Sequence, residues 1–132
     1  MSPAAAASLP IRTAREAADL LAPIFEGAAR ERLAILFLDS ERRLVGRSET
    51  QGGDQAAIDL PLRPIIADAL RFDASGLILA HNHPSGDPTP SDADITATRR
   101  LARVASELGI QVHDHLIFAA DDCKSFRALG LI

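Results

Sequence analysis

Apolar residues along the chain follow two spacings that alternate from segment to segment. Residues at helical spacing predict three helices, over 13–27, 60–73 and 91–108. Short apolar runs between polar turns predict strands over 33–38, 43–50 and 76–80, with one or two more around a tight bend in 110–119. The second strand is expected to pair antiparallel with the first. Strands that alternate with helices indicate an α/β or α+β fold, in which helices cover a mostly buried sheet.

The last predicted helix carries a carboxylate on its apolar face. Asp94, Thr98, Leu101 and Ala105 recur at the i, i+4, i+7, i+11 spacing, so Asp94 is expected to face the core. A buried carboxylate without a partner costs several kcal/mol or becomes protonated. The spacing therefore predicts a positively charged partner for Asp94.

Two histidines follow the strand at 76–80. On an extended strand, side chains two residues apart point the same way, so His81 and His83 are expected to share a face. Two neutral imidazoles and one carboxylate can bind a zinc ion at roughly 2.0–2.1 Å and leave a fourth position open for water. His81, His83 and Asp94 are thus candidate ligands of a catalytic metal.

A structural interpretation also exists for the same stretch. Ser91 can cap the helix, and Asp92 and Asp94 can favour its positive N-terminus, which alone would explain the sequence SDAD. Isolated histidines at a strand end are ordinary polar residues. The combination of two histidines, a short rigid loop and an inward aspartate favours the metal site.

Composition limits the remaining function classes. The 132 residues suit one domain, which we place at 13–132 after a disordered lead-in at 1–12. The net charge is -4 without a basic stripe, so strong nucleic-acid binding is not expected. A single cysteine, Cys123, excludes an internal disulfide and a thiolate zinc site. No leader or membrane-spanning run is evident, which predicts a cytoplasmic protein with no membrane contact.

The motif residues His81, His83, Pro84, Ser91 and Asp94 resemble the H-x-H-P, six residues, S-x-x-D pattern of the JAMM (MPN+/JAB) metalloproteases. From about residue 30 onward, the chain is similar to the bacterial RadC branch of that family. The resemblance implies a mixed sheet flanked by helices, similar to cytidine deaminase. It also implies Zn²⁺ bound by His81, His83 and Asp94, with Ser91 stabilising an oxyanion during hydrolysis of an amide or isopeptide bond in a peptide or protein substrate.

The family also uses an upstream glutamate as general base. An ungapped alignment carried back through residues 52–54 assigns this role to Glu49. The chain departs from the family at Gly53-Asp54 and at 62–64, which puts substrate recognition in doubt more than metal binding. The helix-hairpin-helix module of longer RadC proteins has no room in the residues before Glu31, so its DNA-binding role is not expected here.

Rival sites and functions remain open at this stage. His113 and His115 form a second H-x-H pair, of which His115, with Asp114, matches the family. Asp114 and His115 are expected to have structural roles or to lie beside the metal ligands, and His115 is the better candidate to touch the site. Cys123 is expected to be buried or half-buried and to have no role in the site. Zinc nucleobase deaminases need a P-C-x-x-C pair, which one cysteine cannot supply, whereas non-haem iron also accepts two histidines and a carboxylate. Alternatives to a hydrolase are a non-catalytic metal-binding scaffold and a DNA-repair accessory protein.

Overall fold

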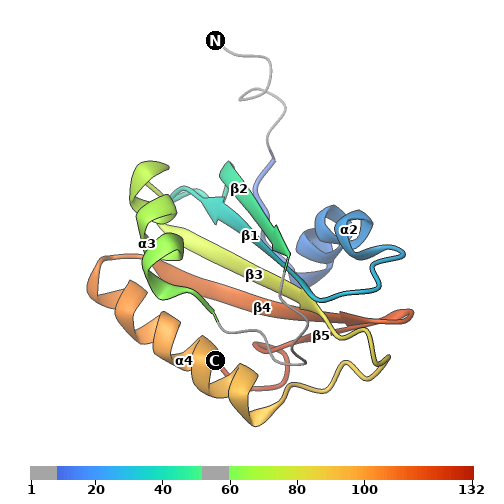
Figure 1. Ribbon diagram of the computed structural model, residues 1–132. Helices are drawn as coiled ribbons and strands as arrows, with labels where there is room; N and C mark the ends of the chain where they lie inside the picture. The colour runs from blue at the N-terminus through green and yellow to red at the C-terminus, as the bar shows by residue number, and fades with distance from the viewer. Residues whose placement is uncertain (1–8, 52–59) are drawn as a thin grey trace.

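A five-stranded mixed sheet forms the centre of the molecule in the computed structural model, which describes residues 9–51 and 60–132 (Figure 1). The strands are β1 (Arg32–Leu38), β2 (Leu44–Gln51), β3 (Gly76–Asn82), β4 (Gln111–Ala119) and β5 (Asp122–Ser125). The helices within the described residues are α2 (Ala14–Phe25), α3 (Leu62–Arg71) and α4 (Asp92–Glu107). The α/β class and the flanking helices agree with the prediction.

The strand order is β2-β1-β3-β4-β5. β1 pairs antiparallel with both β2 and β3, which confirms the predicted pairing of the first two strands. β3 and β4 are parallel, and α4 connects them across one face of the sheet. Figure 1 shows α2 on one face and α3 and α4 on the other. The loop between β3 and α4 therefore leaves the sheet at the end where β3 finishes.

Each face of the sheet has its own apolar core, and the strands contribute alternate residues to the two. Leu33, Leu79 and Leu101 belong to the core under α3 and α4. Ala34 and Ala80 belong to the core under α2. Because neighbouring strands in register direct paired side chains to the same face, these two sets define which way every strand residue points.

Several predicted details differ in the structure. Ile11, placed in the lead-in by the sequence pattern, is buried, and its backbone N–H donates to the Arg42 carbonyl at 2.9 Å. Packing therefore begins before Thr13. Residues 111–119 form one strand without a bend, and the turn to β5 follows at Ala120, which has a φ of 51°. Leu108, the last residue of the predicted helix, is exposed and lies beyond the end of α4.

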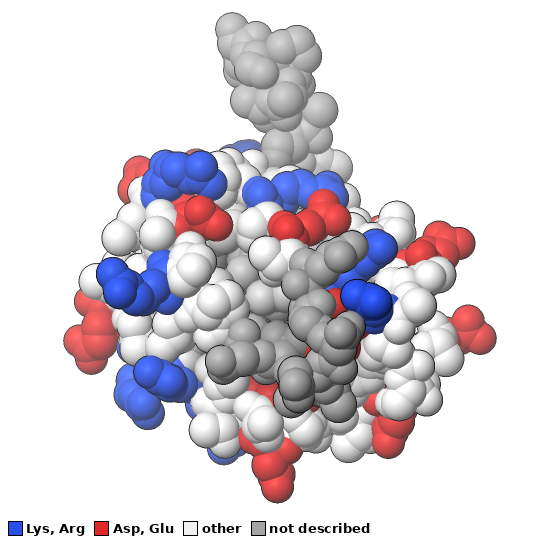
Figure 2. All heavy atoms as spheres, in the orientation of Figure 1, with Lys and Arg blue, Asp and Glu red and all other residues white. Residues whose placement is uncertain are grey.

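Two further observations concern the helices and the charged side chains on one face of the molecule. In the part of the chain that the structure describes, no helix has the length and apolar character needed to span a bilayer. On the face in Figure 2, Lys and Arg side chains are interspersed with Asp and Glu side chains. The expectation of weak nucleic-acid binding therefore remains a prediction consistent with this face.

Candidate metal centre

Three predicted ligands meet where β3 ends and α4 begins. His81 lies in β3, His83 follows that strand, and Asp94 lies in the first turn of α4. His81 Nε2 is 3.0 Å from His83 Nε2 and 3.5 Å from Asp94 Oδ1, and His83 Nε2 is 3.2 Å from Asp94 Oδ2. His81 and Asp94 are buried, and His83 is mostly buried. The structure thus brings together the three residues predicted from the sequence.

A chain of hydrogen bonds fixes the proton on the His81 ring. Thr98 Oγ1 donates its only hydrogen to the Asp94 carbonyl at 2.7 Å, so it must accept from His115 Nδ1, also at 2.7 Å. Burial, and then the neighbouring His81, keep the pKa of His115 well below its usual value, so its Nε2 carries a lone pair. That lone pair accepts from His81 Nδ1–H at 2.6 Å. The His81 ring therefore carries a hydrogen on Nδ1 and directs Nε2 towards His83 and Asp94.

The same reasoning applies to His83. Its Nδ1 lies 2.8 Å from the Asp87 carbonyl oxygen, which can only accept, so Nδ1 carries a hydrogen and Nε2 is the ring nitrogen that faces Asp94. Two Nε2 atoms and a carboxylate thus converge, and a bound cation would take their three electron pairs. Ligands at about 2.0–2.1 Å around a tetrahedral ion lie about 3.3 Å apart. The observed separations of 3.0, 3.2 and 3.5 Å fit such an ion.

The start of α4 orients Asp94. Ser91 caps the helix: its Oγ accepts from the Asp94 backbone N–H at 3.0 Å, while the Ser91 N–H donates to Asp94 Oδ2 at 2.9 Å. Burial by itself would raise the pKa of Asp94, but the His81 side chain and the Ser91 N–H hold it well below its usual value. Asp94 is therefore ionised at neutral pH. Ser91 fulfils the capping role, and because its Oγ accepts there, its own hydrogen stays available for another acceptor.

A second acidic residue lies beside this cluster, and the sequence analysis did not find it. Glu31 precedes β1 and is only 6% exposed, and its Oε2 has no hydrogen-bond partner among the described residues. Burial raises its pKa; the charge of His83 opposes that shift, and the charge of Asp94 adds to it. Glu31 is thus within electrostatic range of two cluster residues. By strand alternation it shares the face of Leu33, which pairs with His81.

Glu49 lies elsewhere. It pairs with Ala34, whose partner on the other side is Ala80, so its side chain is directed to the face covered by α2. His81 points to the opposite face. The Glu49 side chain is 48% exposed and forms an ion pair with Arg47 at 2.8 Å. The structure therefore does not bring Glu49 together with the other predicted site residues.

The two histidines of the second H-x-H pair, His113 and His115, lie in different parts of the structure. His115 contacts the site through His81, as expected. Asp114 does not touch the cluster: its carboxylate accepts from the His115 and Arg127 backbone N–H groups and from the Ser125 hydroxyl, which holds the C-terminal segment against β4. His113 lies away from the cluster and accepts from Arg42 at 2.9 Å.

Asn82 connects the ligand strand to the segment that carries Glu31. Its side-chain oxygen accepts from the Arg32 N–H at 2.7 Å, and its amide nitrogen donates to the Arg30 carbonyl at 3.1 Å. One of these bonds is made to the residue after Glu31 and the other to the residue before it. The residue between the two histidines therefore fixes the position of Glu31 relative to them.

A mixed sheet that presents two histidines and a helix-borne aspartate at one end defines a JAB-type domain with a JAMM-type candidate metal site. The profile of the RadC-like JAB domain family matches residues 11–131, so the chain belongs to that family. A UPF0758 protein from Rhodobacter capsulatus is 44% identical over 102 residues, which are 77% of this chain and 48% of that protein. The chain thus spans about half the length of this curated relative.

Proposed function

We propose that this domain is a zinc-dependent hydrolase of amide or isopeptide bonds in a peptide or protein. The observation that carries the proposal is the convergence of three electron-pair donors beside the buried Oε2 of Glu31, which has no hydrogen-bond partner among residues 9–51 and 60–132. Without bound partners each half of this arrangement costs folding free energy, because the electron pairs of three donors face one another and a buried carboxylate oxygen is desolvated. A bound cation and a substrate water would offset both costs.

His81 Nε2, His83 Nε2 and an Asp94 oxygen would hold the ion. Two nitrogens and one oxygen suit zinc, and a three-residue set leaves a coordination position for water or substrate. Zinc in such a site polarises a carbonyl group and lowers the pKa of water towards ~7. The identity of the metal is part of the proposal, since iron accepts the same three ligands.

Glu31 takes the role of general base in this proposal, in place of Glu49. Its raised pKa, caused mainly by burial, favours the uptake of a proton from the attacking water. The carboxyl group then passes that proton to the leaving nitrogen, so the base is regenerated. The unpartnered Oε2 supports this role, because a carboxylate held by other donors would bind a proton less readily.

Ser91 is the proposed donor to the oxyanion. Its Oγ accepts from the Asp94 N–H, and this bond orients the hydroxyl at the edge of the cluster. The remaining O–H can donate to the oxygen that becomes negative when the carbonyl is attacked. The same hydroxyl thus serves both the helix and the reaction.

The test compares two glutamate variants. Glu31→Gln keeps size and removes the base, so we expect zinc content and melting temperature to change little while turnover falls by about 10² to 10⁴-fold. Glu49→Gln is the matched control and should leave turnover unchanged. Zinc content is measured by mass spectrometry, and turnover with a pooled library of fluorogenic peptides together with a lysine isopeptide.

Four results would contradict parts of this proposal. Unchanged turnover in Glu31→Gln removes this residue from the mechanism, and a loss confined to Glu49→Gln restores the alignment-based assignment. A zinc-loaded wild type that cleaves nothing in the library favours the scaffold alternative. Nanomolar binding of duplex DNA at physiological salt would support the DNA-repair accessory instead, because non-specific binding is typically about 10⁻⁴ to 10⁻⁶ M.

A further inference from the structure

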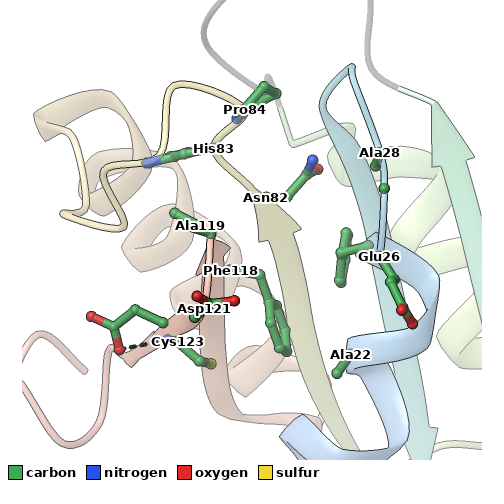
Figure 3. Close-up of a pocket in the computed structure, with 14 residues that line it drawn as sticks. Ala22, Glu26, Ala28, Asn82, His83, Pro84, Phe118, Ala119, Asp121 and Cys123 are labelled. Atoms are coloured by element: carbon green, nitrogen blue, oxygen red, sulfur yellow. Dashed lines mark hydrogen bonds between the residues drawn. The ribbon is translucent and has the colours of Figure 1, made fainter.

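A cavity of about 580 Å³ opens next to the metal-site histidines, on the α2 side of the sheet (Figure 3). One wall is the C-terminal end of α2, and the other is the β4–β5 hairpin. His83 and Pro84 lie at its rim, and the His83 ring is turned away from Glu26. The His83 N–H donates to the Phe118 carbonyl at 2.8 Å. One backbone hydrogen bond thus joins the candidate metal centre to the wall of the cavity.

The cavity combines an aromatic wall with an acidic rim. Phe25 and Phe118 stack at a centroid distance of 5.0 Å and supply apolar surface. Glu26, which follows α2, and Asp121 on the hairpin belong to opposite walls, and both are exposed. Asp122 also lines the cavity, and its carboxylate accepts from the Cys123 N–H at 2.8 Å. None of the three carboxylates is in an ion pair with another described residue, and no Lys or Arg is among the lining residues. The cavity therefore suits a group with an apolar body and a positive end.

We propose that this cavity binds a lysine or arginine side chain of the polypeptide substrate, adjacent to the bond that is cleaved. The inference rests on the proposed amide hydrolysis, and it adds a preferred residue to that reaction. The volume lies within the roughly 300–1,000 Å³ typical of ligand pockets. A long basic side chain places its methylene stem on aromatic surface and its charged end among carboxylates.

Other occupants match the cavity less well. An acidic side chain would meet Glu26 and Asp121 and be repelled. A purely apolar side chain would use the phenylalanines but would desolvate the two carboxylates without pairing them. A cation near the face of Phe118 gains a further cation–π attraction. Cys123 offers no competing covalent chemistry, because burial raises the pKa of its thiol to about 11.

The binding test uses two hexapeptides that differ at one residue, lysine in one and norleucine in the other. Norleucine keeps the aliphatic stem and removes the charge. Each is titrated into the full 132-residue chain labelled with ¹⁵N. We expect the lysine peptide to shift the amide signals of residues 26–28 and 118–123 and to bind about five- to tenfold more tightly. Equal binding of both peptides, or no shifts with either, would overturn the proposal.

A pair of double variants identifies the source of the preference. Glu26→Gln with Asp121→Asn removes two of the three carboxylate charges from the lining and should reduce the preference for lysine. Asp19→Asn with Glu107→Gln makes the same change in net charge at exposed positions that do not line the cavity, and should preserve it. A preference that is unreduced in the first pair, or that is reduced equally in both pairs, would contradict the assignment.

Cleavage measured on the same peptides separates this inference from the proposed hydrolysis. Lysine-selective binding without cleavage of any peptide supports the cavity and counts against the hydrolase. Cleavage with no preference for a basic residue supports the hydrolase and overturns the cavity assignment.

Discussion

Two H-x-H sequences lie on adjacent parallel strands of this sheet, and they have different surroundings. His81 and His83 meet Asp94 and lie close to Glu31, so their surroundings are negative. His113 lies among the cations Arg42 and Arg127. It is also set apart by a register shift, because Leu77 pairs with Val112 while Ile78 pairs with Asp114, which leaves His113 without a strand partner.

The comparison teaches that the histidine spacing alone does not make a metal site. In β3 the regular alternation directs both imidazoles towards a helix that supplies a carboxylate. In β4 the bulge breaks the alternation, so His113 and His115 do not act as a pair. His115 instead supports His81 through a hydrogen bond. A third ligand and an unbroken register decide which pair can bind a metal.

The largest expected effect separates the two pairs directly. Replacing His83 by alanine removes one of three ligands and should abolish stoichiometric zinc binding, whereas His113→Ala should retain one zinc per chain. The measurement is the zinc-to-protein ratio after dialysis, with circular dichroism to confirm that both variants are folded. Full zinc content in His83→Ala would refute the ligand assignment.

An intermediate effect is expected for the support that His115 gives to His81. Thr98→Val removes the hydroxyl that accepts from His115, so the His81 ring is less firmly held with its Nε2 lone pair free. We expect zinc affinity to fall by about 10 to 100-fold, as is typical when a group that orients a metal ligand is lost.

Thr96→Val on the exposed side of the same helix is the control and should leave zinc affinity unchanged. Competition with a fluorescent chelator measures affinity, and ¹⁵N chemical shifts of the histidine rings report the tautomer of His81. An unaltered tautomer and affinity in Thr98→Val would show that the hydrogen-bond chain has no such role.

The smallest expected effect concerns His113 and pH. Burial first, and then the charges of Arg42 and Arg127, lower the pKa of this imidazole from 6.5 to about 4. Above pH 6.5 His113 is neutral in both the folded and unfolded chain, so it adds no pH dependence. As pH falls below 6.5 the unfolded chain takes up a proton that the folded chain does not, and the free energy of unfolding decreases until about pH 4.

His113→Gln should therefore flatten the loss of stability between pH 6.5 and 4 relative to wild type. Urea denaturation of both proteins at several pH values, with metal removed by a chelator, measures this difference. Parallel stability profiles would contradict the assignment of part of the acid sensitivity to His113.

Local sequence patterns were sufficient for most of the elements, β5 excepted, and for the three candidate ligands. The i, i+4, i+7, i+11 stripe that ends in Thr98, Leu101 and Ala105 predicted that Asp94 faces inward, and it is buried at 4% exposure. The apolar runs located β1 and β3 to within two residues at each end. These patterns succeed because spacing along one element determines which residues share a face.

The proposed base was missed because its position depends on pairing between elements. In the sequence, Glu31 and Glu49 are equally plausible candidates for the base, because each lies near the end of a predicted strand. Only the strand register shows that Glu31 lies on the same face of the sheet as His81 and that Glu49 lies on the opposite face. One signal was present in the sequence: Glu31 stands two residues before Leu33, at the start of an apolar strand. That signal becomes useful only when β1 is known to be antiparallel to β3.

Asn82 gives this centre a property that matters for anyone who wishes to transplant it. Its amide bonds to the backbone on both sides of Glu31, so two side-chain hydrogen bonds join the histidine strand to the segment that carries this glutamate. Grafting only the two histidines and the aspartate into another sheet would reproduce the candidate ligands without the hydrogen bonds that position the glutamate. The smallest unit worth moving is a pair of antiparallel strands with Asn82 intact, followed by the capped first turn of a helix.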